Sequence, residues 1–226
     1  MNTFIENYLP NLPMLMPELN IAFVQTITMV SIAFLFSLLL GLPLGIVLAV
    51  TKNENLLKAP RLYFSISFVI DIFRSTPTLI LITAIGPFTR FVVGTKIGVK
   101  GAIVPLVIAS APFLARQIEA ALSNIDNGII EAAKSMGNSL TAIIFRALLP
   151  ESLSSLINAF TITFVSLINF SAIAGAVGGG GLGDFALRYG YQQFRTDIMI
   201  VTIIILLSLV SAVQLVGKYL SQKFKH

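Results

Sequence analysis

The stretch "NIAFVQTITMVSIAFLFSLLLGLPLGIVLAV", residues 20–50, contains no charged side chain. The uncharged run extends from Leu19 to Thr51, and about 20 apolar residues are enough for a helix to cross a bilayer. It therefore predicts a first membrane-spanning helix at residues 21–50. Gly41 and Gly45 stand four residues apart around Pro43, a spacing typical of close helix packing with a mild kink.

The composition extends this interpretation to the whole chain. Hydrophobic residues make up 56% of its 226 residues and charged residues 11%, whereas a soluble domain carries about 25% charged residues. A globule of this length could not bury so much apolar surface, so lipid surrounds most of the chain. Further apolar stretches predict spans at residues 64–85, 102–122, 152–173 and 198–217. We expect one all-α integral membrane domain, residues 1–226, with five transmembrane helices.

Several classes of site are excluded by what the sequence lacks. The chain has no cysteine, and its one histidine is the last residue, His226. It contains no HExxH or GxSxG motif, so we expect no catalytic residue, no bound metal and no enzymatic activity. The stretch "GAVGGGGLG" (Gly175–Gly183) lacks the Gly-Lys-Ser/Thr ending of a phosphate loop, and its glycine content argues against a helix. It is interpreted as a re-entrant segment or a flexible outer loop.

The distribution of basic residues predicts the orientation. Five spans place the termini on opposite sides of the membrane. With the N-terminus outside, the inner segments hold nine basic residues and the outer loops hold five, which agrees with the positive-inside rule. The net charge of +5 is interpreted in this way, and not as a sign of nucleic-acid binding. Residues 123–150 and the C-terminus are then cytoplasmic.

The segment 123–150 interrupts the apolar pattern with two short predicted helices. Asp126 and Ser139 stand where helix N-caps are expected, and Gly137 stands where a left-handed residue ends the first helix. Pro150 is expected to end the second. The apolar positions at helical spacing are Ile129, Ile130, Ala133 and Met136 in the first helix and Leu140, Ile143, Ile144, Ala147 and Leu148 in the second.

Neither short helix can cross a membrane, so the segment is expected to pack beneath the spanning helices. The small side chains of Ala132 and Ala133 would permit the close approach of a partner. The charges of Glu131 and Lys134 beside them would make that partner a protein surface. The alternative is an interfacial loop that only joins the third and fourth spans.

The segment "EAAKSMGNSLTAIIFRALLP" (residues 131–150) resembles the EAA motif of ABC importer permeases. The matching positions are Glu131, Ala132, Ala133, Gly137, Leu149 and Pro150. Other stretches are similar to the methionine-import permeases of bacteria, among them "FRSTP" (residues 73–77) and "APFLAR" (residues 111–116). The resemblance implies the type I importer permease fold and a place in the bacterial cytoplasmic membrane.

The resemblance also implies partners. Members of that family work as homodimers with two separate ATPase subunits, which use ATP and magnesium, and with an extracytoplasmic substrate-binding lipoprotein. Methionine is the implied substrate, and no nucleic acid is involved. Contact with the ATPase would fall on the residues Glu131, Ala132, Ala133, Lys134 and Gly137. The alternatives are a permease for another amino acid, or a helical channel or scaffold that needs no nucleotide.

Two further groups of residues are candidates for function. Asn169 and Ser171 lie late in the fourth predicted span, and the resemblance suggests that this region, with Ile173, lines and gates the path. Helix packing is the alternative. Asp71 and Arg74 lie three residues apart inside the second span, where ionisable groups usually face protein or water. They are interpreted as a structural pair or as residues near the path.

Other local signals concern helix geometry. Pro77 follows Arg74 closely and predicts a kink in the second span. Arg116 and Glu119 are three residues apart near the end of the third span and are expected to pair on one helix face.

Overall fold

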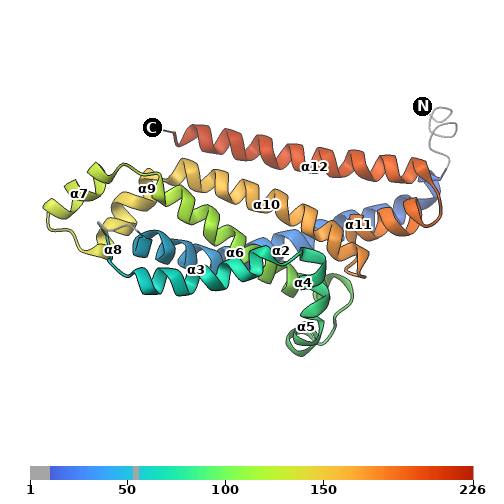
Figure 1. Cartoon of the computed structure of the whole chain (residues 1–226). Coiled ribbons are helices and arrows are strands. Elements are labelled where there is room, and N and C mark those ends of the chain that lie inside the picture. Colours follow the sequence, from blue (N-terminus) through green and yellow to red (C-terminus); the bar gives the residue numbers. More distant parts are fainter. Residues whose placement is uncertain (1–10, 53–55, 226) are drawn as a thin grey trace. The chain divides into compact units, whose positions relative to one another are not determined.

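The structure is a computed structural model that describes residues 11–52 and 56–225. Within these residues the chain is built of helices and contains no strand (Figure 1). The long helices are α2 (Leu12–Lys52), α6 (Gly98–Ser123), α10 (Leu153–Ala176) and α12 (Thr196–Lys223). The shorter elements are α3 (Pro60–Ser75), α4 (Thr78–Ala84), α5 (Gly86–Val93), α7 (Asn127–Ser135), α8 (Leu140–Ile143), the π-helix η1 (Ile144–Leu148), α9 (Leu149–Glu151), α11 (Gly181–Phe185) and the π-helix η2 (Ala186–Tyr191).

The long helices match the expected spans but extend beyond them. In the described residues, α2, α6, α10 and α12 are each long and apolar enough to cross a membrane, and α3 with α4 forms a fifth, broken candidate. The predicted bounds 21–50, 102–122, 152–173 and 198–217 follow the apolar stretches. The helices continue past them because polar residues beyond an apolar stretch keep the same backbone hydrogen bonds.

The second predicted span, 64–85, is not one helix. Between α3 and α4 the axis bends by 99°, far more than the expected kink. Thr76 is extended, with φ −78° and ψ 126°, because the ring of Pro77 excludes helical geometry at the residue before it. The hydroxyls of Ser75 and Thr76 donate to the carbonyl of Ile72 at 3.1 and 2.9 Å, in the last turn before the break.

Two segments that lie between the predicted spans contain helices. α5 lies within residues 86–101, and η2 lies in the polar stretch after the glycines. The glycine-rich stretch is itself partly helical, because α10 ends at Ala176 and α11 begins at Gly181. A Cβ atom on Gly175 or Gly183 would overlap backbone of Asp184 or Ala172. These glycines therefore permit close packing of backbone against backbone. The glycine content alone could equally have indicated a flexible loop.

The chain divides into two compact units. The first comprises Met1–Leu35, Pro77–Ile108 and Phe164–Val213, and the second comprises Phe36–Thr76, Ala109–Thr163 and Gln214–His226. Each of the four long helices contributes residues to both.

In the first unit, α2, α6 and α10 share a core. Met29 and Ala33 of α2, Leu106 of α6 and Leu167 of α10 are fully buried there. The start of α11 is fixed by side chains of α2, because the N–H of Gly181 donates to Gln25 Oε1 at 2.9 Å and the N–H of Leu182 to Thr26 Oγ1 at 2.8 Å. These bonds satisfy N–H groups that a helix start leaves without partners.

In the second unit, α2 and α6 pack through the glycine pair. A Cβ atom on Gly41 would lie 2.9 Å from the carbonyl oxygen of Ala111, and one on Gly45 would lie 2.6 Å from Ile118 Cβ. The close packing expected from the four-residue spacing is confirmed. One turn away, the buried hydroxyls of Ser37 and Ser110 are 2.5 Å apart.

Gly45→Ala should destabilise the protein, whereas Gly86→Ala should not. Alanine normally stabilises a helix by about 1 kcal/mol relative to glycine. At Gly45 the added methyl overlaps Ile118, and overpacking costs about 1–3 kcal/mol. At Gly86 the nearest atom beyond the local backbone is 3.8 Å away. Thermal unfolding of the detergent-solubilised variants measures the difference, and equal melting temperatures would contradict the packing at Gly45.

Candidate coupling site

The first short helix of the segment 123–150 begins and ends as its sequence predicts. The side chain of Asp126 accepts a hydrogen bond from the N–H of Gly128 at 2.8 Å and caps α7. Gly137 is left-handed, with φ +75°, and its N–H donates to the carbonyl of Lys134 at 2.8 Å. The amide side chain of Asn138 then donates to the carbonyl of Ala133 at 3.0 Å. The turn that follows α7 is therefore held by backbone and side-chain bonds.

The second half of the segment differs from the prediction at its end. Ser139 caps α8, since its hydroxyl accepts the N–H of Ala142 at 3.3 Å. Pro150 does not end the helix: η1 widens the backbone to π geometry, and the chain continues through α9 to α10. Pro150 is the second residue of α9, which follows η1 without a break. The wider π turn before it accommodates a residue that has no N–H to donate.

One face of the segment is buried in the core of the second unit. Ile130, Ile143 and Leu148 are at most 2% exposed and pack in a cluster with Leu114 and Ile118 of α6. This burial, with that of the cluster's other members, fixes the segment beneath the helices that it joins.

Of the positions assigned to the packed face of the first helix, Ala133 is confirmed and Met136 is wrong. Ala133 is 5% exposed and belongs to the buried cluster, so it cannot offer a surface to a partner. Met136, expected on the packed face, is 74% exposed. The reason is the turn at Gly137, which takes Met136 out of the helix that would have directed it inward.

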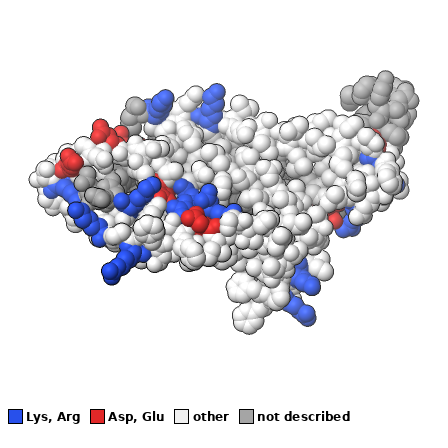
Figure 2. Space-filling view, viewed as in Figure 1, with Lys and Arg blue, Asp and Glu red and all other residues white. Residues whose placement is uncertain are grey.

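The exposed residues define a small surface, which we call the α7 tip. It comprises Glu131, Ala132, Lys134, Met136 and Gly137. One apolar side chain thus lies beside an alanine and two opposite charges. The end of the molecule that carries α7 and α8 shows both acidic and basic groups at its surface (Figures 1 and 2).

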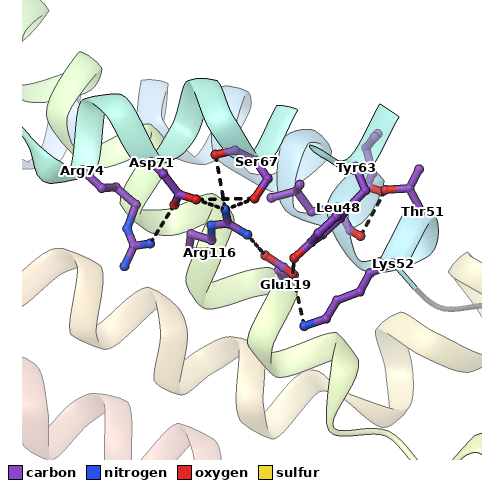
Figure 3. A network of polar contacts seen from close by, with 10 residues as sticks. Leu48, Thr51, Lys52, Tyr63, Ser67, Asp71, Arg74, Arg116 and Glu119 are labelled. Carbon is purple, nitrogen blue, oxygen red and sulfur yellow. Dashed lines mark hydrogen bonds and ion pairs between the residues drawn. The ribbon is translucent and has the colours of Figure 1, made fainter. Parts of the chain in front are cut away.

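A network of charged and polar side chains joins α2, α3 and α6 within the same unit (Figure 3). Arg116 of α6 donates to Glu119 Oε2 at 2.6 Å and to Asp71 Oδ2 at 2.7 Å. It also donates to the carbonyl of Ser67 at 3.3 Å and to the hydroxyl of the same residue. Arg116 therefore connects its own helix to α3.

Glu119 makes the remaining contacts of this network. Its Oε1 accepts a hydrogen bond from the hydroxyl of Tyr63 at 3.0 Å and lies 3.4 Å from the ammonium of Lys52, the last residue of α2. The side chain of Glu119 is only 5% exposed. The cost of burying its charge is therefore offset by the ion pairs with Arg116 and Lys52. The carboxylate holds the ends of α2 and α6 and the start of α3 together.

The predicted pairs at three-residue spacing both form. Arg116 pairs with Glu119, and Arg74 Nη1 lies 3.4 Å from Asp71 Oδ1. The contacts of Arg116 with Asp71 and of Glu119 with Tyr63 and Lys52 were missed. They join residues 45 or more positions apart, for which no local spacing in one sequence provides a signal.

The candidate path residues do not share one surface. Ser171 is 2% exposed, and its hydroxyl donates to the carbonyl of Ile168 in its own helix at 2.7 Å. Asn169 is exposed, and Ile173 packs against the core of the first unit. Ser171 therefore contributes to the packing of α10 in this structure. Of the three residues, only Asn169 has an exposed side chain.

A polar groove between α10 and α12 was missed. It lies in the second unit, has a volume of about 720 Å³, and is lined by Ser154, Ser155, Asn158, Thr161, Ile162, Gln214, Lys218, Ser221, Gln222 and Lys225. The signal was present, because Gln214, Lys218 and Gln222 recur every four residues in an otherwise apolar helix. The hydroxyls of Ser154 and Ser221, 2.9 Å apart, join the two helices there.

Comparison with protein families shows the family to which this helical chain belongs. Residues 41–226, which include the whole α7 tip, match the model described as "Binding-protein-dependent transport system inner membrane component". The chain belongs to this family. Inner membrane components of binding-protein-dependent transport systems are membrane proteins, as the apolar spans require.

Named relatives of this inner membrane component are similar over most of its length. The "Probable D-methionine transport system permease protein MetI" of Vibrio cholerae is 47% identical over 202 residues, which is 89% of this chain and 90% of the relative. The "Methionine import system permease protein MetP" of Bacillus subtilis is 49% identical over 152 residues, 67% of this chain and 68% of the relative.

Solved structures of such transport systems have the same fold. A chain of the "MetNI methionine ABC transporter" in an inward-facing conformation superposes with a TM-score of 0.91 and 40% identity, and the match covers 95% of this chain and 99% of that one. A chain of "an amino acid ABC transporter with histidines" gives a TM-score of 0.75 at 18% identity. The second match shows the shared fold alone.

Proposed function

We propose that this chain is the membrane-spanning permease subunit of an ATP-driven importer of methionine. The observation that carries the proposal is the 40–49% identity to proteins named as methionine transport permeases, one of them over 89% of the chain. The exposed α7 tip supports it, because a permease that hydrolyses nothing itself needs a surface through which another subunit acts.

The proposed assembly contains two copies of the chain, two ATPase subunits that bind ATP and magnesium, and an extracytoplasmic binding lipoprotein. It lies in the cytoplasmic membrane of a bacterium, with the N-terminus outside. This orientation rests on the excess of basic residues in the inner segments, and it places the α7 tip on the side of the ATPase.

In the proposed mechanism the ATPase subunits move together when they bind ATP. Their motion reaches the spanning helices through α7, whose buried face is held by the core of the second unit. A ligand shifts a conformational equilibrium only if it makes different contacts in the two states, and the α7 tip would make such contacts. The path then opens alternately to the two sides.

The polar groove between α10 and α12 is the proposed hydrated wall of this path. Polar side chains in spanning helices usually face protein or water, because lipid cannot satisfy them. The natural chain has no cysteine, so a single introduced cysteine reports its own surroundings.

A cysteine at Asn158 should react with a water-soluble maleimide at least about tenfold faster than one at Val216. Both residues are exposed in the structure, but only Asn158 lines the groove, and thiol reaction requires the thiolate, which forms in water. The labelling rates of the two variants in membranes measure the difference. Equal rates would remove the groove from the path.

The substrate is tested by uptake in proteoliposomes that contain the chain, its ATPase and its binding protein. Labelled methionine should accumulate only with ATP, and an excess of unlabelled methionine should compete. Histidine, arginine or glutamate should not. Uptake of a polar amino acid without uptake of methionine would contradict the methionine assignment. The chain would then be a permease for another amino acid.

A further inference from the structure

A cavity lies in the first unit. Neither the segment 123–150 nor the polar groove contributes to its lining. It is enclosed by α4, α5, the start of α6 and the end of α10, and its volume is about 280 Å³. Pockets for small organic molecules measure roughly 300–1,000 Å³, so this one is of a size for a ligand of few atoms.

The cavity contains a buried hydroxyl without a partner. Thr89 of α5 lines it and is 1% exposed, and its Oγ1 makes no hydrogen bond to any described residue. Helical threonines elsewhere in the chain, such as Thr163 and Thr202, donate to the carbonyl four residues before them at 2.8 Å. A buried polar group left unpaired is costly, and such groups mark places where something else binds.

The charge of the cavity has one sign. Lys96 lines it, and no acidic residue does. In the part of the chain that the structure describes, Lys96 forms no ion pair. Lys96 therefore borders the cavity that holds the free hydroxyl, and an ammonium and a hydroxyl are both donors to a carboxylate.

The rest of the wall is apolar and fixed. Ile82 and Ala102 belong to the buried core of the first unit, and Pro105 and Val177 complete the lining. The second hydroxyl in the wall is already used, because Thr83 donates to the carbonyls of Leu79 and Ile80 at 3.1 and 2.9 Å. The cavity therefore suits a small molecule with a carboxylate at one end and an uncharged, apolar tail.

We propose that this cavity binds the transported amino acid, with its carboxylate at Thr89 and Lys96 and its apolar side chain against Ile82 and Pro105. The inference rests on the proposed function, since methionine has a carboxylate and an uncharged, apolar side chain. Its α-ammonium has no acidic partner in the lining and would remain hydrated. An anionic lipid headgroup shares the negative charge and is the other source of such a ligand. The site would make the permease itself selective, in addition to the binding protein.

Binding of labelled methionine to the full-length permease in nanodiscs of neutral lipid tests the site without ATPase or binding protein. Thr89→Val keeps the shape and removes the free hydroxyl, so affinity should fall about tenfold. Thr202→Val removes a buried hydroxyl that lies outside the cavity, and this variant should bind methionine as the natural chain does. Lys96→Gln should weaken binding by a similar factor, whereas Lys100→Gln, outside the cavity, should not.

A purely structural role for Thr89 gives a different result. Valine would then relieve an unpaired polar group, so the melting temperature would stay equal or rise while binding stayed unchanged, and the inference would be overturned. Absence of methionine binding to the natural chain, or its loss when anionic lipid is added to the nanodiscs, would also overturn it. ATP-driven uptake by the whole assembly is measured separately, so the proposed function survives these failures and falls only if uptake itself is absent.

Discussion

Ala132→Trp should reduce ATP-driven uptake at least about tenfold while leaving the permease folded in the membrane. Ala132 is exposed on the α7 tip and lies between Glu131 and Lys134. An indole at this position projects from the surface and prevents the ATPase from approaching the helix closely. A tenfold loss corresponds to about 1.4 kcal/mol, which the loss of one well-packed contact at an interface readily exceeds.

The measurement is uptake and ATP hydrolysis in the same proteoliposomes, with Ala212→Trp as the matched control. Ala212 is an exposed alanine of α12, outside the α7 tip, and the control should transport normally. Hydrolysis by Ala132→Trp should no longer respond to the loaded binding protein. Normal uptake by this variant, with normal insertion, would remove the α7 tip from coupling.

Ala133 requires a different interpretation. Because it is buried in the core of the second unit, a bulky residue there would displace Ile130 and its neighbours. Such a variant would lose uptake because the core is overpacked. Its loss of uptake would therefore not test whether the ATPase docks there. The exposed Ala132 is the position at which docking is tested without disturbing the fold.

Glu119→Ala should be the most destabilising single substitution in the polar network. Its carboxylate is 5% exposed and is the partner of Arg116 and Lys52. Breaking a buried ion pair by removing one partner costs about 3–5 kcal/mol when the other charge is left uncompensated. Arg116 keeps its bond to Asp71, so the cost should lie at the lower end of this range. Native proteins are stable by only about 5–15 kcal/mol, so such a loss should lower the melting temperature by several degrees.

Arg74→Gln is the control for this prediction. Its ion pair with Asp71 is partly exposed on both sides, at 38% and 54%, and exposed pairs contribute about 0–1 kcal/mol. Glu119→Gln keeps an acceptor for Tyr63 and should fall between the two. Thermal unfolding of the solubilised variants ranks them, and a melting temperature of Glu119→Ala equal to that of Arg74→Gln would show that the network does not hold the helices together.

The sequence predicted the features whose cause is local. Apolar stretches long enough to cross a bilayer predict spans, and α2, α6, α10 and α12 lie where those stretches are. Asp126, Gly137 and Ser139 occupy the positions that capping chemistry predicts, because each acts on backbone groups within three residues of itself.

The features that were missed depend on distant residues or on backbone adjustments. Arg116 reaches Asp71 only because α3 and α6 pack together, which no periodicity reports. Pro150 should have ended a helix, but the π turn of η1 accommodates it. Ala133 and Ala132 are adjacent alanines, and only the packed structure distinguishes the one that faces the core.

This chain is proposed to move methionine only when a separate ATPase drives it. The most direct measurement is methionine accumulation in proteoliposomes with and without the ATPase subunit, at equal amounts of permease. We expect concentrative uptake with the ATPase, ATP and magnesium, and none when the ATPase or the nucleotide is omitted. Equal methionine flux without the ATPase would contradict the account and would identify the chain as a nucleotide-independent channel.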